Sequence, residues 1–212
     1  MTKPLALGKA VHKALERIIE KTDFEDAVFE GWAEADFHPE VEREELEELV
    51  RSAPVYPGMG ETELYFCLPL DEDDLFSPQV QGYIDLVQDG LFVDWKTNWR
   101  TYHVLDNMQL SLYAWALMQM KGINQIEGKL YFLRFRQESG HVFDEADAER
   151  ARQWALGLAR EIEDRRLQIA VELDSVARMF PPRPSSLCSH CPFVIECYLK
   201  FGLKVLNNTN YV

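Results

Sequence analysis

Residues 82–97 read Gly82-Tyr-Ile-Asp-Leu-Val-Gln-Asp-Gly-Leu-Phe-Val-Asp-Trp-Lys-Thr97, and this stretch decides the fold. Two apolar runs, rich in β-branched and aromatic residues, flank the pair Asp89-Gly90. An Asp-Gly pair between such runs is typical of a tight hairpin turn. The sequence therefore predicts two strands, 82–87 and 91–97, joined as a hairpin.

The second strand of this hairpin carries polar residues on one face only. Residues i and i+2 of a strand point to the same face, so Asp94 and Lys96 lie together, and Val93 and Trp95 take the opposite face. If the hairpin pairs tightly, Asp85 of the first strand comes close to Asp94. Two neighbouring carboxylates are costly unless a cation lies between them.

The rest of the chain supplies helices and strands around this hairpin. Periodicity predicts helices at 8–20, 22–50 (continuous or broken), 106–121 and 144–171, strands at 63–70 and 128–136, a turn at 138–140 and a short strand at 141–143. This order indicates an α/β (α+β mixed) fold with a central mixed sheet flanked by helices. We expect one domain over residues 1–212, with a core at about 5–180 and a cysteine-containing segment at 181–212.

The composition limits where the protein acts and what it binds. The net charge is −14, from 36 acidic and 22 basic residues, which argues mildly against non-specific duplex binding. The stretch 96–136 is nevertheless net basic. No apolar run reaches the 18 residues that indicate a membrane span, and the apolar stretch at the N-terminus is too short for a signal peptide. We expect a cytoplasmic protein without a membrane partner.

The hairpin residues match the needs of phosphodiester hydrolysis. Carboxylates such as Asp85 and Asp94 are the ligands that Mg²⁺ and Mn²⁺ prefer, and the backbone carbonyl of Trp95 lies between the two functional side chains of its strand. Lys96 can orient the attacking water or stabilise the charge that develops on a phosphoryl group. Asp and Lys are also common at strand ends, so the spacing alone leaves a structural role open. His12, at the edge of an apolar helical stripe, is by pattern alone a partly buried structural histidine.

A second group of candidate ligands lies near the C-terminus. Cys188, Cys191 and Cys197 fall within ten residues, which in a cytosolic chain indicates a metal or cluster site rather than disulfides. His190 could complete a zinc site, although its adjacency to Cys191 is awkward for one tetrahedral centre. Cys67, in the middle of a predicted strand, is interpreted as a small buried residue.

Five motifs in order resemble a known family, over residues of about 5 to 200. They are Gly8-Lys-Ala-Val-His12, Gly82-Tyr-Ile-Asp85, Asp94-Trp-Lys96-Thr97, Gln109-Leu-Ser-Leu-Tyr113, and Cys188-x-x-Cys191-x5-Cys197. The sequence resembles the PD-(D/E)XK nucleases, and among them the RecB-like branch, which includes AddB-type recombination proteins and CRISPR-associated RecB-like exonucleases. The resemblance implies a restriction-endonuclease-like core.

The resemblance also implies roles for particular residues. His12 becomes a metal ligand together with Asp85 and Asp94, and Gln109 and Tyr113 line the nucleic-acid channel. Glu63 resembles a glutamate that precedes the Gly-x-x-Asp strand, which implies an accessory role. In cluster-bearing members, the three C-terminal cysteines bind a [4Fe–4S] cluster with a fourth cysteine upstream of the Gly-x-x-x-His helix. No cysteine precedes Gly8 here.

The sequence thus leads to a functional hypothesis with two alternatives. We expect a Mg²⁺- or Mn²⁺-dependent DNA nuclease, an exonuclease acting on single strands or duplex ends in DNA repair, recombination or phage DNA processing, with a helicase or recombination protein as a partner. The first alternative is a non-catalytic, nuclease-like DNA-binding module of a larger assembly. The second is a structural iron–sulfur or zinc protein.

Overall fold

The computed structural model describes residues 1–172, 176–185, 187–188 and 191–201. These residues belong to two compact units, Met1–Gly157 and Leu158–Val212. The expectation of a single domain with a core reaching residue 180 stays a prediction. None of the helices in the described ranges is both long and apolar enough to span a membrane.

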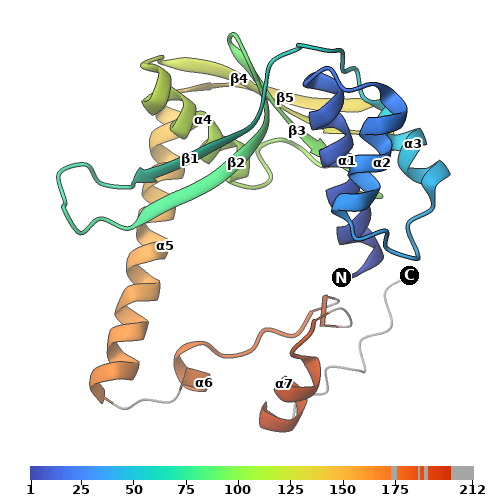
Figure 1. Ribbon diagram of the computed structural model, residues 1–212. Coiled ribbons are helices and arrows are strands. Elements are labelled where there is room, and N and C mark those ends of the chain that lie inside the picture. Colours follow the sequence, from blue (N-terminus) through green and yellow to red (C-terminus); the bar gives the residue numbers. More distant parts are fainter. Residues whose placement is uncertain (173–175, 186, 189–190, 202–212) are drawn as a thin grey trace. The chain divides into compact units, whose positions relative to one another are not determined.

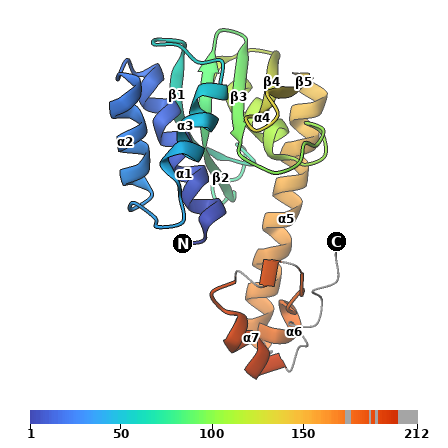
Figure 2. The same cartoon turned by 90° about the vertical axis from the view of Figure 1, so that its right-hand side faces the viewer.

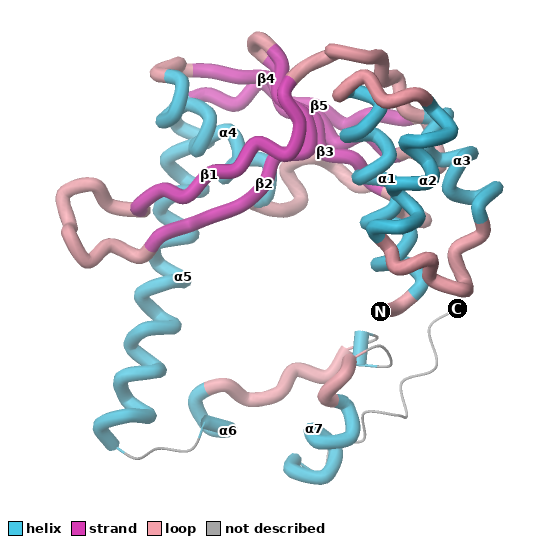
Figure 3. Tube along the Cα trace, viewed as in Figure 1, coloured by secondary structure: helices cyan, strands magenta, loops and turns pink. Residues whose placement is uncertain are grey.

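The first unit contains the sheet and the helices around it (Figures 1 and 3). In chain order, its elements are α1 (Lys3–Ile19), α2 (Phe24–Glu34), α3 (Arg43–Ser52), β1 (Glu61–Pro69), β2 (Gln79–Gln88), β3 (Leu91–Lys96), α4 (Gln109–Lys121), β4 (Gln125–Phe132), β5 (Gln137–Asp144) and the start of α5 (Glu145–Glu172). The second unit holds the rest of α5, α6 (Val176–Met179) and α7 (Val194–Phe201).

The sheet has five strands in the order β1-β2-β3-β4-β5. The β2–β3 hairpin is antiparallel and pairs Leu86 with Val93 and Gln88 with Leu91 around the Asp89-Gly90 turn. Strands β3 and β4 run parallel, with α4 as the crossover between them, and the other pairs are antiparallel. This confirms the predicted mixed sheet with flanking helices.

The two faces of β3 pack against different helices, as its alternating sequence predicts. Val93 and Trp95 are buried in a cluster formed mainly by residues of α1, α2 and α3. Phe92 points to the other face, where its ring meets that of Tyr113 from α4. In Figure 2, α1, α2 and α3 lie together at one side of the sheet, whereas α4 lies near β4 and β5. Asp94 and Lys96 therefore lie on the face that α4 approaches.

Helix α1 is held in place by its close approach to α2. Ala10 and Ala14 are fully buried, and Gly31 of α2 lies against them. A Cβ atom added at Gly31 would be 2.3 Å from the Ala10 carbonyl oxygen, a distance that real contacts do not allow. Since α1 also carries His12, this contact fixes the position of a candidate site residue.

We expect Gly31→Ala to lower the free energy of unfolding by about 1–3 kcal/mol, because the two helices must separate to admit the methyl group. Gly157→Ala is the matched control: it lies in α5, and an added Cβ meets nothing within 4 Å. We expect Gly157→Ala to leave the free energy of unfolding unchanged or to raise it by up to about 1 kcal/mol. Urea denaturation measures both. Equal stability of the two variants would contradict the close α1–α2 packing.

One predicted boundary is wrong. The sequence predicts a strand to residue 136 and a turn at 138–140, but β4 ends at Phe132, the turn occupies 133–136, and β5 begins at Gln137. The turn forms early because Leu133 is buried in the cluster with α1–α3, and Arg134 pairs with Glu45 at 2.7 Å. Arg136 then takes a positive φ of 50°, which a local pattern does not predict for arginine.

Candidate active site

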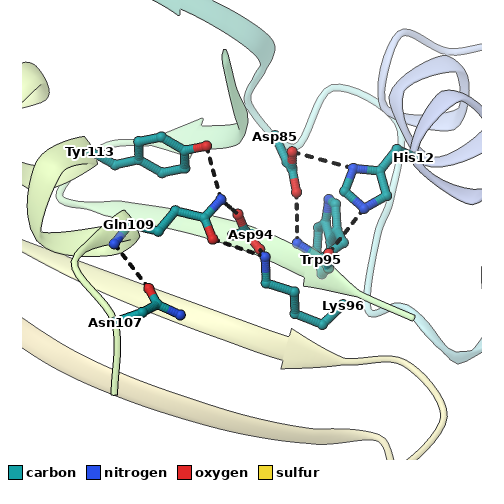
Figure 4. Close-up of polar contacts among 8 residues, drawn as sticks. All are labelled: His12, Asp85, Asp94, Trp95, Lys96, Asn107, Gln109 and Tyr113. Carbon is teal, nitrogen blue, oxygen red and sulfur yellow. Dashed lines mark hydrogen bonds and ion pairs between the residues drawn. The ribbon is translucent and has the colours of Figure 1, made fainter. Parts of the chain in front are cut away.

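Helix α1 places His12 against the open end of the hairpin, beyond the last β2–β3 pair, Leu86 with Val93 (Figure 4). Its Nδ1 atom is 3.3 Å from Asp85 Oδ1, and its Nε2 atom is 3.0 Å from the carbonyl oxygen of Trp95. The other oxygen of Asp85 accepts a hydrogen bond of 2.7 Å from the Trp95 backbone N–H. Five potential metal-ligand atoms on three residues, separated by up to 83 positions in sequence, thus lie together.

The other half of the site is a network around Gln109, the first residue of α4 (Figure 4). The Gln109 side-chain amide donates to Asp94 Oδ1 at 2.9 Å and to the Tyr113 hydroxyl at 3.1 Å. Its carbonyl oxygen accepts a hydrogen bond of 3.1 Å from Lys96 Nζ. Lys96 Nζ also forms an ion pair of 2.5 Å with Asp94 Oδ2. Gln109 therefore orients the carboxylate and the ammonium at the same time.

The charges of the site depend on burial and on one another. Burial lowers the pKa of His12, but the adjacent Asp85 carboxylate outweighs it, and the pKa rises to about 9. Burial and the negative charge of Asp85 raise the pKa of Asp94 to about 6, against the opposing effect of Lys96. Burial lowers the pKa of Lys96, yet Asp94 raises it by more, so the pKa lies above its usual value. Lys96 is therefore a cation at neutral pH.

Glu63 of β1 joins the site in an unusual backbone conformation. Its φ is 49°, in the left-handed region. The β1–β2 pairs on either side of it are Thr62–Leu86 and Leu64–Ile84. Burial and the charge of Asp85 raise the pKa of its carboxyl. A non-glycine residue at positive φ costs free energy and persists where the surrounding structure holds it. Here that conformation brings Glu63 near His12 and Asp85.

The donor set suits a hard divalent cation. Among the described residues, one group of three potential ligands has its ligand atoms all within 4.8 Å of one another, namely His12, Glu63 and Asp85. Asp94 is only 2% exposed, and its Oδ2 atom accepts no hydrogen bond of regular geometry from the described residues. Glu63, Asp85 and Asp94 bring negative charge to the site, and His12 and Lys96 offset part of it. Carboxylates, a carbonyl and an imidazole fit Mg²⁺ or Mn²⁺.

The structure does not gather the C-terminal cysteines in the same way. Cys188, Cys191 and Cys197 are free thiols at intermediate exposure, and within the described ranges their sulfur atoms do not form a group as tight as the one around His12. His190 lies outside the described residues. Cys67, expected to be buried, is exposed, and its thiol donates to Gln79 Oε1 at 3.4 Å. That expectation was wrong because β1 and β2 leave this part of their surface uncovered.

Sequence reasoning missed two lysines beside the site. An open cleft of about 480 Å³ is lined by His12, Asp85 and Glu63, and also by Lys9 and Lys13 of α1. Lys9 pairs with Glu34 at 3.3 Å, and Lys13 with Glu16 at 2.8 Å. A signal was present for Lys9, because residues three apart on a helix are neighbours, which places Lys9 near His12. Without knowing that His12 faces the hairpin, however, these lysines look like ordinary surface charges.

Comparison with solved structures adds only a distant likeness. The chain is similar to a protein from Eubacterium rectale described as a "putative exonuclease", with 14% sequence identity over 91% of this chain and 80% of that chain. The TM-score is 0.44. A search of the curated proteins found no match.

Comparison with protein families gives a decisive result. The sequence profile of the PD-(D/E)XK nuclease superfamily matches residues 1–198, which include the hairpin, α1 and α4. The match covers both halves of the site described above. The chain belongs to the PD-(D/E)XK nuclease superfamily.

Proposed function

We propose that this protein is a Mg²⁺- or Mn²⁺-dependent DNA nuclease, and more narrowly an exonuclease of the RecB-like branch that acts in DNA repair, recombination or phage DNA processing. The observation that carries the proposal is the convergence of His12, Asp85 and the Trp95 carbonyl beside the Asp94–Lys96 pair. A carboxylate cluster with a fixed ammonium at its edge suits hydrolysis of a phosphodiester. Membership of a nuclease superfamily supports the same reaction class.

Each side chain has a definable task in this proposal. His12, Asp85, Asp94 and the Trp95 carbonyl are the proposed metal ligands, and Glu63 is an accessory acid. When bound there, a divalent cation would supply a Lewis acid and a bound water of lowered pKa. Lys96, kept protonated by Asp94, donates hydrogen bonds toward the charge that develops on the phosphoryl oxygens. Gln109 positions Lys96, as its 3.1 Å hydrogen bond indicates.

The cleft beside α1 offers a site for the substrate backbone. Lys9 and Lys13 lie in the cleft wall close to His12, and each is within one helical turn of it. Phosphate groups are bound mainly by such basic side chains. The same lining also holds Glu16, Glu34, Glu63 and Asp85, so we infer that backbone binding there depends on Lys9 and Lys13 together with a bound cation that offsets these carboxylates.

The direct test is incubation of the purified protein with end-labelled single-stranded and duplex DNA in Mn²⁺, Mg²⁺ or excess chelator. We expect metal-dependent loss of full-length DNA that chelator prevents, with mononucleotide or short products if the action starts from an end. DNA binding without cleavage in either metal would favour the non-catalytic module instead. Neither binding nor cleavage would contradict the proposal altogether.

Metal binding can be tested without any nuclease assay. A ligand present at about 100 times its dissociation constant stabilises a folded protein by about 2.7 kcal/mol, so Mn²⁺ should raise the melting temperature of the wild type. His12→Gln should reduce that rise and require at least about tenfold more Mn²⁺ for half the effect. His141→Gln is the matched control, because His141 pairs with Asp147 at 2.9 Å on β5, outside the site. An undiminished Mn²⁺ effect in His12→Gln would remove His12 from the ligand set.

The cysteine group stays a prediction. We propose a [4Fe–4S] cluster or a zinc ion at Cys188, Cys191 and Cys197 on the sequence pattern alone. The visible absorption spectrum of anaerobically purified protein, together with iron and zinc analysis, decides between the two. A protein that contains neither metal would contradict the proposal for the cysteines without affecting the nuclease site.

A further inference from the structure

A second cleft, also of about 480 Å³, opens on the α4 side of the candidate site. Its apolar wall includes Phe66 of β1, Leu112 and Tyr113 of α4, and Trp154 of α5. The Trp154 side chain is 48% exposed, although it belongs to the helix segment that packs in the first unit. Phe66 is buried, and its ring lies edge-on to Tyr113 with centroids 5.9 Å apart. The cleft therefore has a firm aromatic floor and one accessible indole.

Most of the polar side chains of this second cleft are amides. Gln81 of β2, Asn107 just before α4, and Gln109 contribute the amide side chains of its lining. The lining contains no charged residue, in contrast to the lysines and acids around His12. Amides both donate and accept hydrogen bonds, and an aromatic wall offers a stacking surface. A flat, uncharged, heteroaromatic ligand with hydrogen-bonding edges matches this combination.

The second cleft is continuous with the proposed catalytic centre. Gln109 belongs to its lining and also contacts Asp94 and Lys96 at 2.9 and 3.1 Å. Tyr113 is likewise shared, through its 3.1 Å hydrogen bond with Gln109. A single residue, Gln109, therefore separates an occupant of this cleft from Asp94 and Lys96, the groups assigned to phosphodiester hydrolysis.

We propose that the second cleft binds one unpaired nucleobase of the substrate strand, next to the phosphodiester that is cleaved, with Trp154 as the stacking residue. This inference rests on the nuclease function proposed above. A base inside a duplex is stacked and paired, so its faces and edges are not free to enter a cleft. The cleft thus assigns a single-stranded end or segment as the substrate. The first cleft, beside α1, has a charged lining that suits the phosphate backbone of the substrate. The second cleft, beside α4, has an uncharged lining that suits a neutral base.

The test compares Trp154→Ala with the wild type on a single-stranded oligonucleotide. We expect KM to rise about tenfold and kcat to change little, since base–aromatic stacking supports binding rather than the chemical step. Trp154→Phe should retain most of the affinity because it keeps an aromatic face. Phe29→Ala is the control: Phe29 is 56% exposed on α2, and it does not line either cleft. It should leave KM unchanged.

Substrates with an abasic residue placed at each position in turn identify the base that is bound. For the wild type, one position near the cleavage site should raise KM by about the same tenfold factor, and in Trp154→Ala that position should have no further effect. Cleavage that is insensitive both to Trp154→Ala and to every abasic position would overturn the base site while leaving the nuclease function intact. An inactive wild type would instead contradict the proposed function itself.

Discussion

Replacing Asp94 with asparagine is expected to lower the rate of DNA cleavage by roughly a thousandfold or more. Asparagine keeps the shape of the side chain and can still contact Gln109, but it lacks the negative charge that a metal ligand needs here. Asp94 is 2% exposed and pairs with Lys96, so the substitution changes both the proposed ligand set and the environment of the lysine. Single-turnover cleavage of end-labelled single-stranded DNA in Mn²⁺ gives the rate.

A control within the same hairpin separates loss of chemistry from loss of folding. Asp89→Asn makes the identical substitution in the β2–β3 turn, and Asn-Gly is also a favoured hairpin turn. We expect this variant to cleave DNA at the rate of the wild type. If Asp94→Asn retains wild-type activity, the hairpin carboxylate is not part of the catalytic centre.

Lys96→Met should lower kcat by roughly a hundred- to a thousandfold and change KM only slightly. Methionine preserves much of the length of the lysine side chain but removes the charge that would face the phosphoryl oxygens. The pKa of Lys96 is raised because the effect of the Asp94 carboxylate outweighs the effect of burial, so the ammonium is present throughout the neutral pH range. Steady-state kinetics with single-stranded DNA separates kcat from KM.

Lys129→Met provides the comparison for Lys96. Lys129 lies on the neighbouring strand β4 and forms ion pairs with Glu127 at 3.5 Å and Glu138 at 3.2 Å, outside the site. Its removal should leave kcat unchanged. Two variants that lose activity to the same degree would indicate a general effect of charge on the sheet, not a role for Lys96.

The hairpin was predictable because its information is local. Alternation places Asp94 and Lys96 on one face of β3, and in the structure Lys96 Nζ lies 2.5 Å from Asp94 Oδ2. Val93 and Trp95 are buried on the other face. The Asp-Gly turn fixes the register, and Gly90 takes the positive φ of 76° that such turns require. Local pattern is enough wherever a strand has one polar and one apolar face.

His12 illustrates where local pattern ends. By spacing it sits at the edge of an apolar stripe, and only the resemblance to a nuclease family predicted it as a ligand. Its position beside Asp85 depends on how α1 packs across the sheet, which rests on the α1–α2 contact at Gly31. The same limit applies to Trp154, to which local pattern assigns no site. Its place in the second cleft follows from tertiary packing.

The central claim is that His12, Asp85, Asp94 and the Trp95 carbonyl hold a divalent cation. A crystal of the protein grown with Mn²⁺, examined by anomalous scattering, tests it most directly. We predict one strong anomalous peak within coordination distance of His12, Asp85, Asp94 and the Trp95 carbonyl oxygen. Manganese bound elsewhere, with no peak among these four groups at saturating Mn²⁺, would contradict the account.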